Sequence, residues 1–148
     1  MKLIRKRLLY PASPQGNHIY MFTANSVVRN NGCLVMGAGC AKTVKTTYKG
    51  VDILLGNTID HLGRFGVQFV IWNGHPIGAF QTKIDWKDGS PLDLVKYSVK
   101  RLTLIAKKRP NHTFHLPCPA VNHGGRSEEE VLPLLESLPD NVYVYLDK

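Results

Sequence analysis

Two glycine-rich turns constrain the fold of this 148-residue chain more than any other feature. The first has the sequence Met-Gly-Ala-Gly-Cys-Ala at positions 36–41 and runs into a helix-like stretch, and the second is centred on Gly124 and Gly125. A glycine turn that opens a helix lets backbone N–H groups approach an anion, whose charge the helix N-terminus also favours. Two such turns suit a ligand with more than one phosphate. The alternative is that both are tight turns and nothing more.

The rest of the chain alternates between strand-like and helix-like stretches. Hydrophobic patterning predicts strands at residues 3–10, 18–24, 65–72, 77–84, 113–116 and 141–146. The Asn-Gly pair at positions 73–74 predicts a hairpin. Helices are predicted at residues 41–48 and 91–108, with Ser90 as the cap of the longer one, and residues 50–60 are ambiguous. This order predicts an α/β protein in which helices cover both faces of a mixed sheet.

The last part of the chain carries a further helix signal. Ser127 and Glu130 have the spacing of a capping box, and Pro133 follows within the same apolar stretch. Because proline removes a backbone donor, this helix is expected to be short or kinked.

Composition predicts a single domain that spans residues 1–148. The chain is 43% hydrophobic and 20% charged, which is ordinary for a folded protein. No apolar run is long enough to cross a bilayer, so no membrane partner is expected. Three cysteines and the absence of a signal-peptide pattern favour the cytoplasm. The net charge of +8 predicts an anionic partner, but no nucleic-acid-binding motif is present, so nucleic-acid binding rests on charge alone.

Several short motifs resemble those of macro domains, the ADP-ribose-binding family. Residues 36–41 resemble that family's Met-Gly-x-Gly-Ile-Ala turn, and Thr-Ala-Asn-Ser at positions 23–26 is similar to its strand-end asparagine motif. Leu-Pro at 116–117, followed by Asn-His-Gly-Gly at 122–125, resembles its second phosphate loop. The resemblance covers nearly the whole chain and implies a three-layer α/β/α fold with a central mixed sheet. It is nearest to small macro domains that act as ADP-ribosyl hydrolases or ADP-ribose phosphatases, and to macro-like proteins of bacteriophages, which would work in the host cytoplasm.

The resemblance also implies a set of ligand-binding residues at the carboxyl ends of the strands. In the family the two loops hold a diphosphate and side chains of the first turn meet the distal ribose. Asparagines before the first turn have an alternative role as caps of tight turns. Carried over residue by residue, the candidates are Asn25, Asn31, Gly37, Ala38, Gly39, Cys40, Asn122, His123, Gly124 and Gly125.

Two residues are candidates for catalysis. One branch of the family uses a lysine on a central strand as a nucleophile, with an aspartate in the second loop, and Lys83 occupies a comparable place. An ungapped alignment puts Gly124 where the aspartate stands, and the alternative for Lys83 is a solvated lysine at a strand end. His123 can act as a general acid or base near neutral pH, or can donate to a phosphate without catalysing anything. The family's N-terminal adenine-binding aspartate has no counterpart, because residues 1–24 contain no Asp or Glu.

The sequence therefore predicts a protein that binds ADP-ribose or a related NAD-derived nucleotide, and either sequesters it or hydrolyses an ADP-ribosyl or phosphate linkage. The alternatives are an active ADP-ribosyl hydrolase or ADP-ribose 1″-phosphatase, and a basic nucleic-acid-binding module. ADP-ribosylated protein or nucleic acid is a further candidate partner. No cofactor is expected. A metal is not expected either, because His112 and His115 lie three apart on a predicted strand and face opposite ways. Trp72 and Trp86 are expected to be packing residues.

Overall fold

The computed structural model describes residues 1–147 and contains a six-stranded sheet with the order β1-β6-β5-β2-β4-β3. Neighbouring strands are parallel except for the antiparallel pair of β3 and β4, which confirms the predicted mixed sheet. The strands are β1 (Lys2–Ile4), β2 (His18–Ala24), β3 (Val67–Trp72), β4 (His75–Gln81), β5 (Thr113–Pro117) and β6 (Val142–Tyr145).

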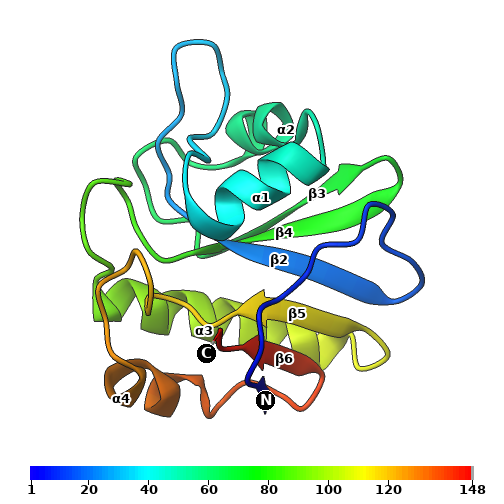
Figure 1. Ribbon diagram of the computed structural model, residues 1–148, viewed down its shortest axis with the longest axis vertical. Helices are drawn as coiled ribbons and strands as arrows, with labels where there is room; N and C mark the ends of the chain where they lie inside the picture. Colours follow the sequence, from blue (N-terminus) through cyan, green and yellow to red (C-terminus); the bar gives the residue numbers. More distant parts are fainter. Residues whose placement is uncertain (148) are drawn as a thin grey trace.

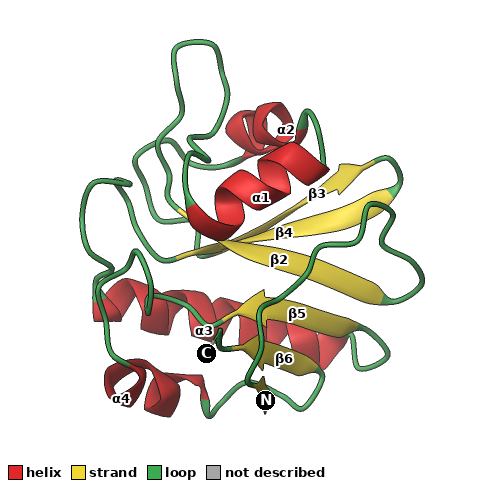
Figure 2. Cartoon of the chain, in the orientation of Figure 1, coloured by secondary structure: helices red, strands yellow, loops and turns green. Residues whose placement is uncertain are grey.

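Helices lie on both sides of this sheet, as the three-layer α/β/α prediction requires (Figures 1 and 2). One face is covered by α1 (Gly39–Thr47) and α2 (Val51–Thr58), the second of which falls in the stretch that sequence left ambiguous. The other face is covered by α3 (Leu92–Lys108), α4 (Glu128–Val131) and the 3₁₀ helix η1 (Leu132–Leu135). Successive strand residues supply the two cores: Met21 packs beneath α3, and Phe22 packs beneath α1 and α2. No helix among residues 1–147 combines the length and apolarity needed to cross a bilayer.

Two local predictions are confirmed in detail. Asn73 and Gly74 have φ angles of 47° and 80°, and Trp72 pairs with His75, so a two-residue turn joins β3 to β4. Ser127 caps α4 through a complete capping box with Glu130. The helix changes to the 3₁₀ form at η1, which contains the predicted helix-breaking proline.

Three other predictions are wrong in instructive ways. The first strand ends at Ile4, which pairs with Tyr145, the last residue of its neighbour β6. Beyond it, Arg5 pairs with Glu128 at 3.3 Å and Arg7 with Asp147 at 3.0 Å. Ser90 does not cap α3, whose N-cap is Pro91. Trp86 is not a packing residue, since 52% of its surface is exposed.

A buried histidine lies on the α1/α2 face of the sheet, in the part formed by β5 and its neighbours. The Nε2 atom of His115 is 2.9 Å from His18 Nδ1, its Nδ1 atom is 2.8 Å from the Tyr145 hydroxyl, and its ring stacks on Tyr20. Burial, with a smaller contribution from the charge of His18, lowers the pKa of His115 to about 4. Folding therefore favours the neutral imidazole.

The free energy of unfolding should fall as the pH drops from about 6.5 to about 4. In this window the unfolded chain takes up a proton at residue 115 while the folded chain does not. The loss should be about 2–3 kcal/mol, measured by urea unfolding across the window. In His115→Gln the free energy of unfolding should change little across this pH range. His75→Gln is the control, and it should keep the decrease seen in the wild-type protein. An equal decrease in His115→Gln and in wild type would contradict the assignment of this pH dependence to His115.

Candidate ligand-binding site

The two glycine loops meet at the carboxyl edge of the sheet. The first glycine loop, residues 37–40, includes the first two residues of α1, and the second glycine loop, residues 122–125, follows β5. Because β2 and β5 are parallel neighbours, their carboxyl ends lie side by side. A Cβ at Gly39 would lie 3.0 Å from Cδ2 of His123, so the loops are in direct contact. The loops gather at the left edge of the molecule in Figure 1.

The first glycine loop combines a left-handed residue with an unobstructed backbone. Gly39 has a φ of 59° and is the first residue of α1, while Ala38 is the N-cap and provides no side-chain cap for the helix. Gly37 is exposed, and no protein atom lies within 4 Å of the position a Cβ would take there. The N–H groups at the start of α1 are therefore free of a side-chain cap, in the arrangement that suits an anion.

The second glycine loop is held tightly by the segment that precedes α3. The Ser90 N–H donates to the Gly124 carbonyl over 3.0 Å, and Arg126 Nε donates to the Ser90 carbonyl over 2.8 Å. A Cβ at Gly124 would lie 2.5 Å from Ala120 Cα and from Ser90 Oγ, so only glycine fits there. Gly125 has a φ of 74° and donates its N–H to the Asn122 carbonyl. Within the two loops, the left-handed glycines are thus Gly39 and Gly125.

Comparison with known proteins gives matches at the level of structure. No family model and no curated protein matches this sequence. The macrodomain of Thermus aquaticus DarG is similar with a TM-score of 0.72 and 20% identity, over 99% of this chain and 97% of that one. A Trypanosoma brucei macrodomain in complex with ADP is similar with a TM-score of 0.64 and 11% identity, over 97% of this chain and 61% of that one. The chain has a macrodomain fold.

A longer protein also contains a region similar to this chain. Thermosipho africanus DarTG, solved in complex with ADP-ribose, matches 86% of this chain with a TM-score of 0.70 and 20% identity. This chain spans only 37% of the length of that protein.

The candidate asparagines before the first glycine loop are engaged within the protein. Asn25 accepts the Val27 N–H through Oδ1 over 2.9 Å and donates through Nδ2 to the Val35 carbonyl over 3.1 Å. Asn31 accepts the Cys33 N–H over 3.1 Å, in a loop that projects at the top of Figure 1. These bonds give both side chains a turn-capping role. Among residues 1–147, no hydrogen bond joins Asn31 to the second glycine loop.

The cysteine of the first glycine loop faces β2. Its Sγ accepts the Thr23 N–H over 3.4 Å and lies 3.2 Å from the Thr23 hydroxyl, and the side chain is half-buried. Cys40 therefore ties the start of α1 to the end of β2.

The catalytic candidates come together across the two loops. Lys83 Nζ donates to the His123 carbonyl over 2.8 Å, and the exposed imidazole of His123 lies against Gly39. Sequence reasoning missed two neighbours of this pair. One is Trp86, whose carbonyl lies 3.4 Å from Lys83 Nζ, and the other is Ser90, a buried serine whose Oγ has no hydrogen-bond partner among residues 1–147. Neither residue has a local sequence signal for this position, since Ser90 contacts the second glycine loop, far along the chain, and the exposure of Trp86 follows from the fold.

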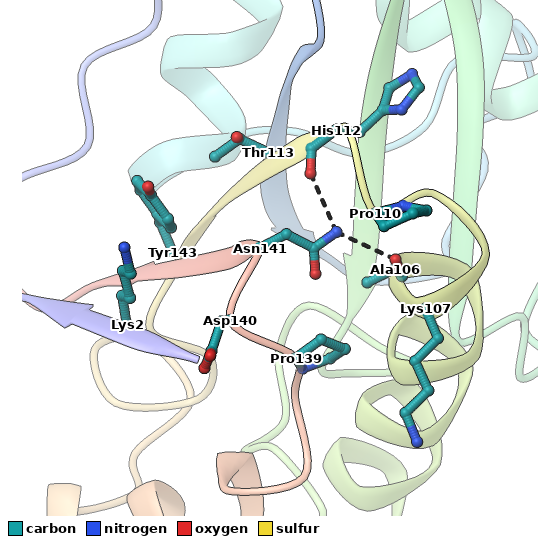
Figure 3. A pocket seen from close by; sticks show the side chains of 10 residues that line it. All are labelled: Lys2, Ala106, Lys107, Pro110, His112, Thr113, Pro139, Asp140, Asn141 and Tyr143. Carbon is teal, nitrogen blue, oxygen red and sulfur yellow. Dashed lines mark hydrogen bonds between the residues drawn. The ribbon is translucent and has the colours of Figure 1, made fainter.

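A hollow of about 500 Å³ lies at the opposite, amino-terminal edge of the strands (Figure 3). At its centre Asn141 Nδ2 donates to the carbonyls of Ala106, Arg109 and His112 over 3.0–3.1 Å. Asn141 thereby caps the last turn of α3, so the polar side chain at the centre of this hollow has a structural role. Within the part of the chain that the structure describes, no three His, Cys, Asp or Glu side chains are grouped as a metal site requires.

Proposed function

We propose that this protein binds ADP-ribose or a related NAD-derived nucleotide, with its diphosphate held between the two glycine loops. The observation that carries the proposal is the direct contact of Gly39 with His123, beside a Gly37 backbone that no side chain covers. The uncapped start of α1 and the net charge of +8 favour the same anionic ligand. The ADP-ribose complex of DarTG and the ADP complex of the trypanosome macrodomain add support from proteins of the same fold.

Binding without turnover is the form of the proposal that the geometry favours. A lysine-dependent covalent route needs an acidic partner, and Gly124 occupies the corresponding place in the ungapped alignment. The tight packing around Gly124 leaves no room for an aspartate side chain without moving Ala120 or Ser90. The protein would then sequester its nucleotide, or recognise ADP-ribosylated protein or nucleic acid.

The second candidate function is hydrolysis of an ADP-ribosyl linkage or of ADP-ribose 1″-phosphate. It is favoured by one observation, the exposed imidazole of His123 at the junction of the loops, where it can transfer a proton to or from a bound water. A basic nucleic-acid-binding role has only the net charge in its favour.

Isothermal titration with ADP-ribose, followed by mass analysis of the recovered ligand, tests these functions in one sample. Saturable heat with an unchanged ligand is the expected result. The same mass analysis should be run on ADP-ribose 1″-phosphate and on an ADP-ribosylated peptide. Conversion that His123→Ala removes would establish the hydrolase instead, and an absence of binding to all three would contradict the proposed function.

A further inference from the structure

The ammonium group of Lys83 joins the two segments that border the site. Lys83 lies just beyond the end of β4, and its Nζ is 2.8 Å from the His123 carbonyl and 3.4 Å from the Trp86 carbonyl. One carbonyl belongs to the second glycine loop and the other to the segment that leads into α3. The bonds made by Ser90 and Arg126 fasten the same two segments a few residues further along.

Holding a carbonyl fixes the direction of the N–H group in the same peptide. The His123–Gly124 peptide is planar and trans, so the Gly124 N–H points away from the oxygen that Lys83 holds. The next N–H group in the loop, that of Gly125, is used by the Asn122 carbonyl. The Gly124 N–H makes no hydrogen bond within residues 1–147. The N–H groups of Asn122 and His123 make none among these residues either, and of the three the Gly124 N–H is the one whose direction the Lys83 contact sets.

Rotation of the His123–Gly124 peptide would turn the Gly124 N–H away from a bound anion. It would present the His123 carbonyl oxygen to a phosphate and turn the Gly124 N–H away, which replaces an attraction with a repulsion. A charged donor opposite the carbonyl opposes that rotation, because a hydrogen bond from an ammonium group is stronger than one from a neutral donor.

We propose that Lys83 is a positioning residue, which orients the Gly124 N–H toward a phosphate of the ligand and is not a nucleophile. This proposal rests on the proposed binding of ADP-ribose. A nucleophilic lysine has to bring its nitrogen to the ribose carbon, whereas Lys83 Nζ is engaged with two backbone carbonyls. Attack on a ribose would require it to leave the 2.8 Å contact that orders the loop.

The test compares the dissociation constant for ADP-ribose among four proteins: wild type, Lys83→Met, Lys83→Arg and Lys87→Met. Lys87 is the matched control, since it is an exposed lysine of the same segment whose Nζ lies 3.8 Å from Asp85. Lys83→Met should raise Kd about tenfold, the loss of roughly one charge-assisted hydrogen bond. Lys87→Met removes an equal charge and should change Kd less than about twofold, and Lys83→Arg should recover most of the affinity because it keeps a donor.

Two further readouts separate positioning from other roles. The amide signal of Gly124 in a ¹H–¹⁵N spectrum of the ligand-free protein should shift in Lys83→Met and stay in place in Lys87→Met. Equal Kd values for Lys83→Met and Lys87→Met would overturn the proposal. So would a Lys83→Met variant that binds normally but loses turnover, which is the behaviour of a nucleophile. A wild-type protein that does not bind ADP-ribose would instead contradict the proposed function.

Discussion

Gly37→Val should abolish measurable ADP-ribose binding while leaving thermal stability unchanged. No protein atom lies within 4 Å of a Cβ at Gly37, and its backbone is not in the left-handed region, so valine meets no obstacle within the protein itself. Its methyl groups would occupy the space in front of the first glycine loop, where the proposal places the diphosphate. A loss of about a hundredfold in affinity or more is expected, since both the phosphate contact and the approach to Gly39 would be blocked.

The measurement is a calorimetric titration of the variant beside its thermal unfolding curve. Ala12→Val is a suitable control, because it also introduces a valine at an exposed position, outside both glycine loops. Normal binding by Gly37→Val would make the first loop a structural turn only. A large fall in melting temperature would show that the site is more tightly packed than the geometry indicates.

Gly124→Val, unlike Gly37→Val, should lower the stability of the protein. A Cβ there would lie 2.5 Å from both the Cα and the carbonyl oxygen of Ala120, and from Ser90 Oγ, in a buried part of the loop. Overpacking of this kind costs about 1–3 kcal/mol or more, so the midpoint of urea unfolding should fall clearly below that of wild type. Binding should also be lost, because the loop must shift to accept the side chain.

The pair of glycine variants thus separates two reasons for using glycine. At Gly37 the side chain would obstruct the ligand, and at Gly124 it would obstruct the protein. An unfolding midpoint for Gly124→Val equal to that of wild type would contradict the tight packing described for the second loop.

Features governed by short-range chemistry were predictable from the sequence. The Asn-Gly hairpin and the Ser127 capping box depend on neighbouring residues, and both occur as expected. The cap of α3 was not predictable in this way. Ser90 looks like an N-cap, yet its backbone N–H bonds to Gly124, a residue far along the chain, and its Oγ has no hydrogen-bond partner among residues 1–147.

The site was predictable as a meeting of loops but not in its internal contacts. Parallel neighbours place the ends of β2 and β5 together, so the approach of Gly39 to His123 follows from topology. The bond from Lys83 to the His123 carbonyl spans 40 residues and has no local signature. Nor could sequence tell which glycine in each turn is left-handed, because glycine permits either sign of φ.

The claim that both glycine loops hold phosphate is tested most directly by comparing AMP, ADP and ADP-ribose in titrations of the wild-type protein. A single phosphate can engage only one loop, whereas ADP keeps both phosphates and lacks only the distal ribose. The account predicts that ADP and ADP-ribose bind at least about tenfold more tightly than AMP. Equal affinity for AMP and ADP-ribose would contradict it.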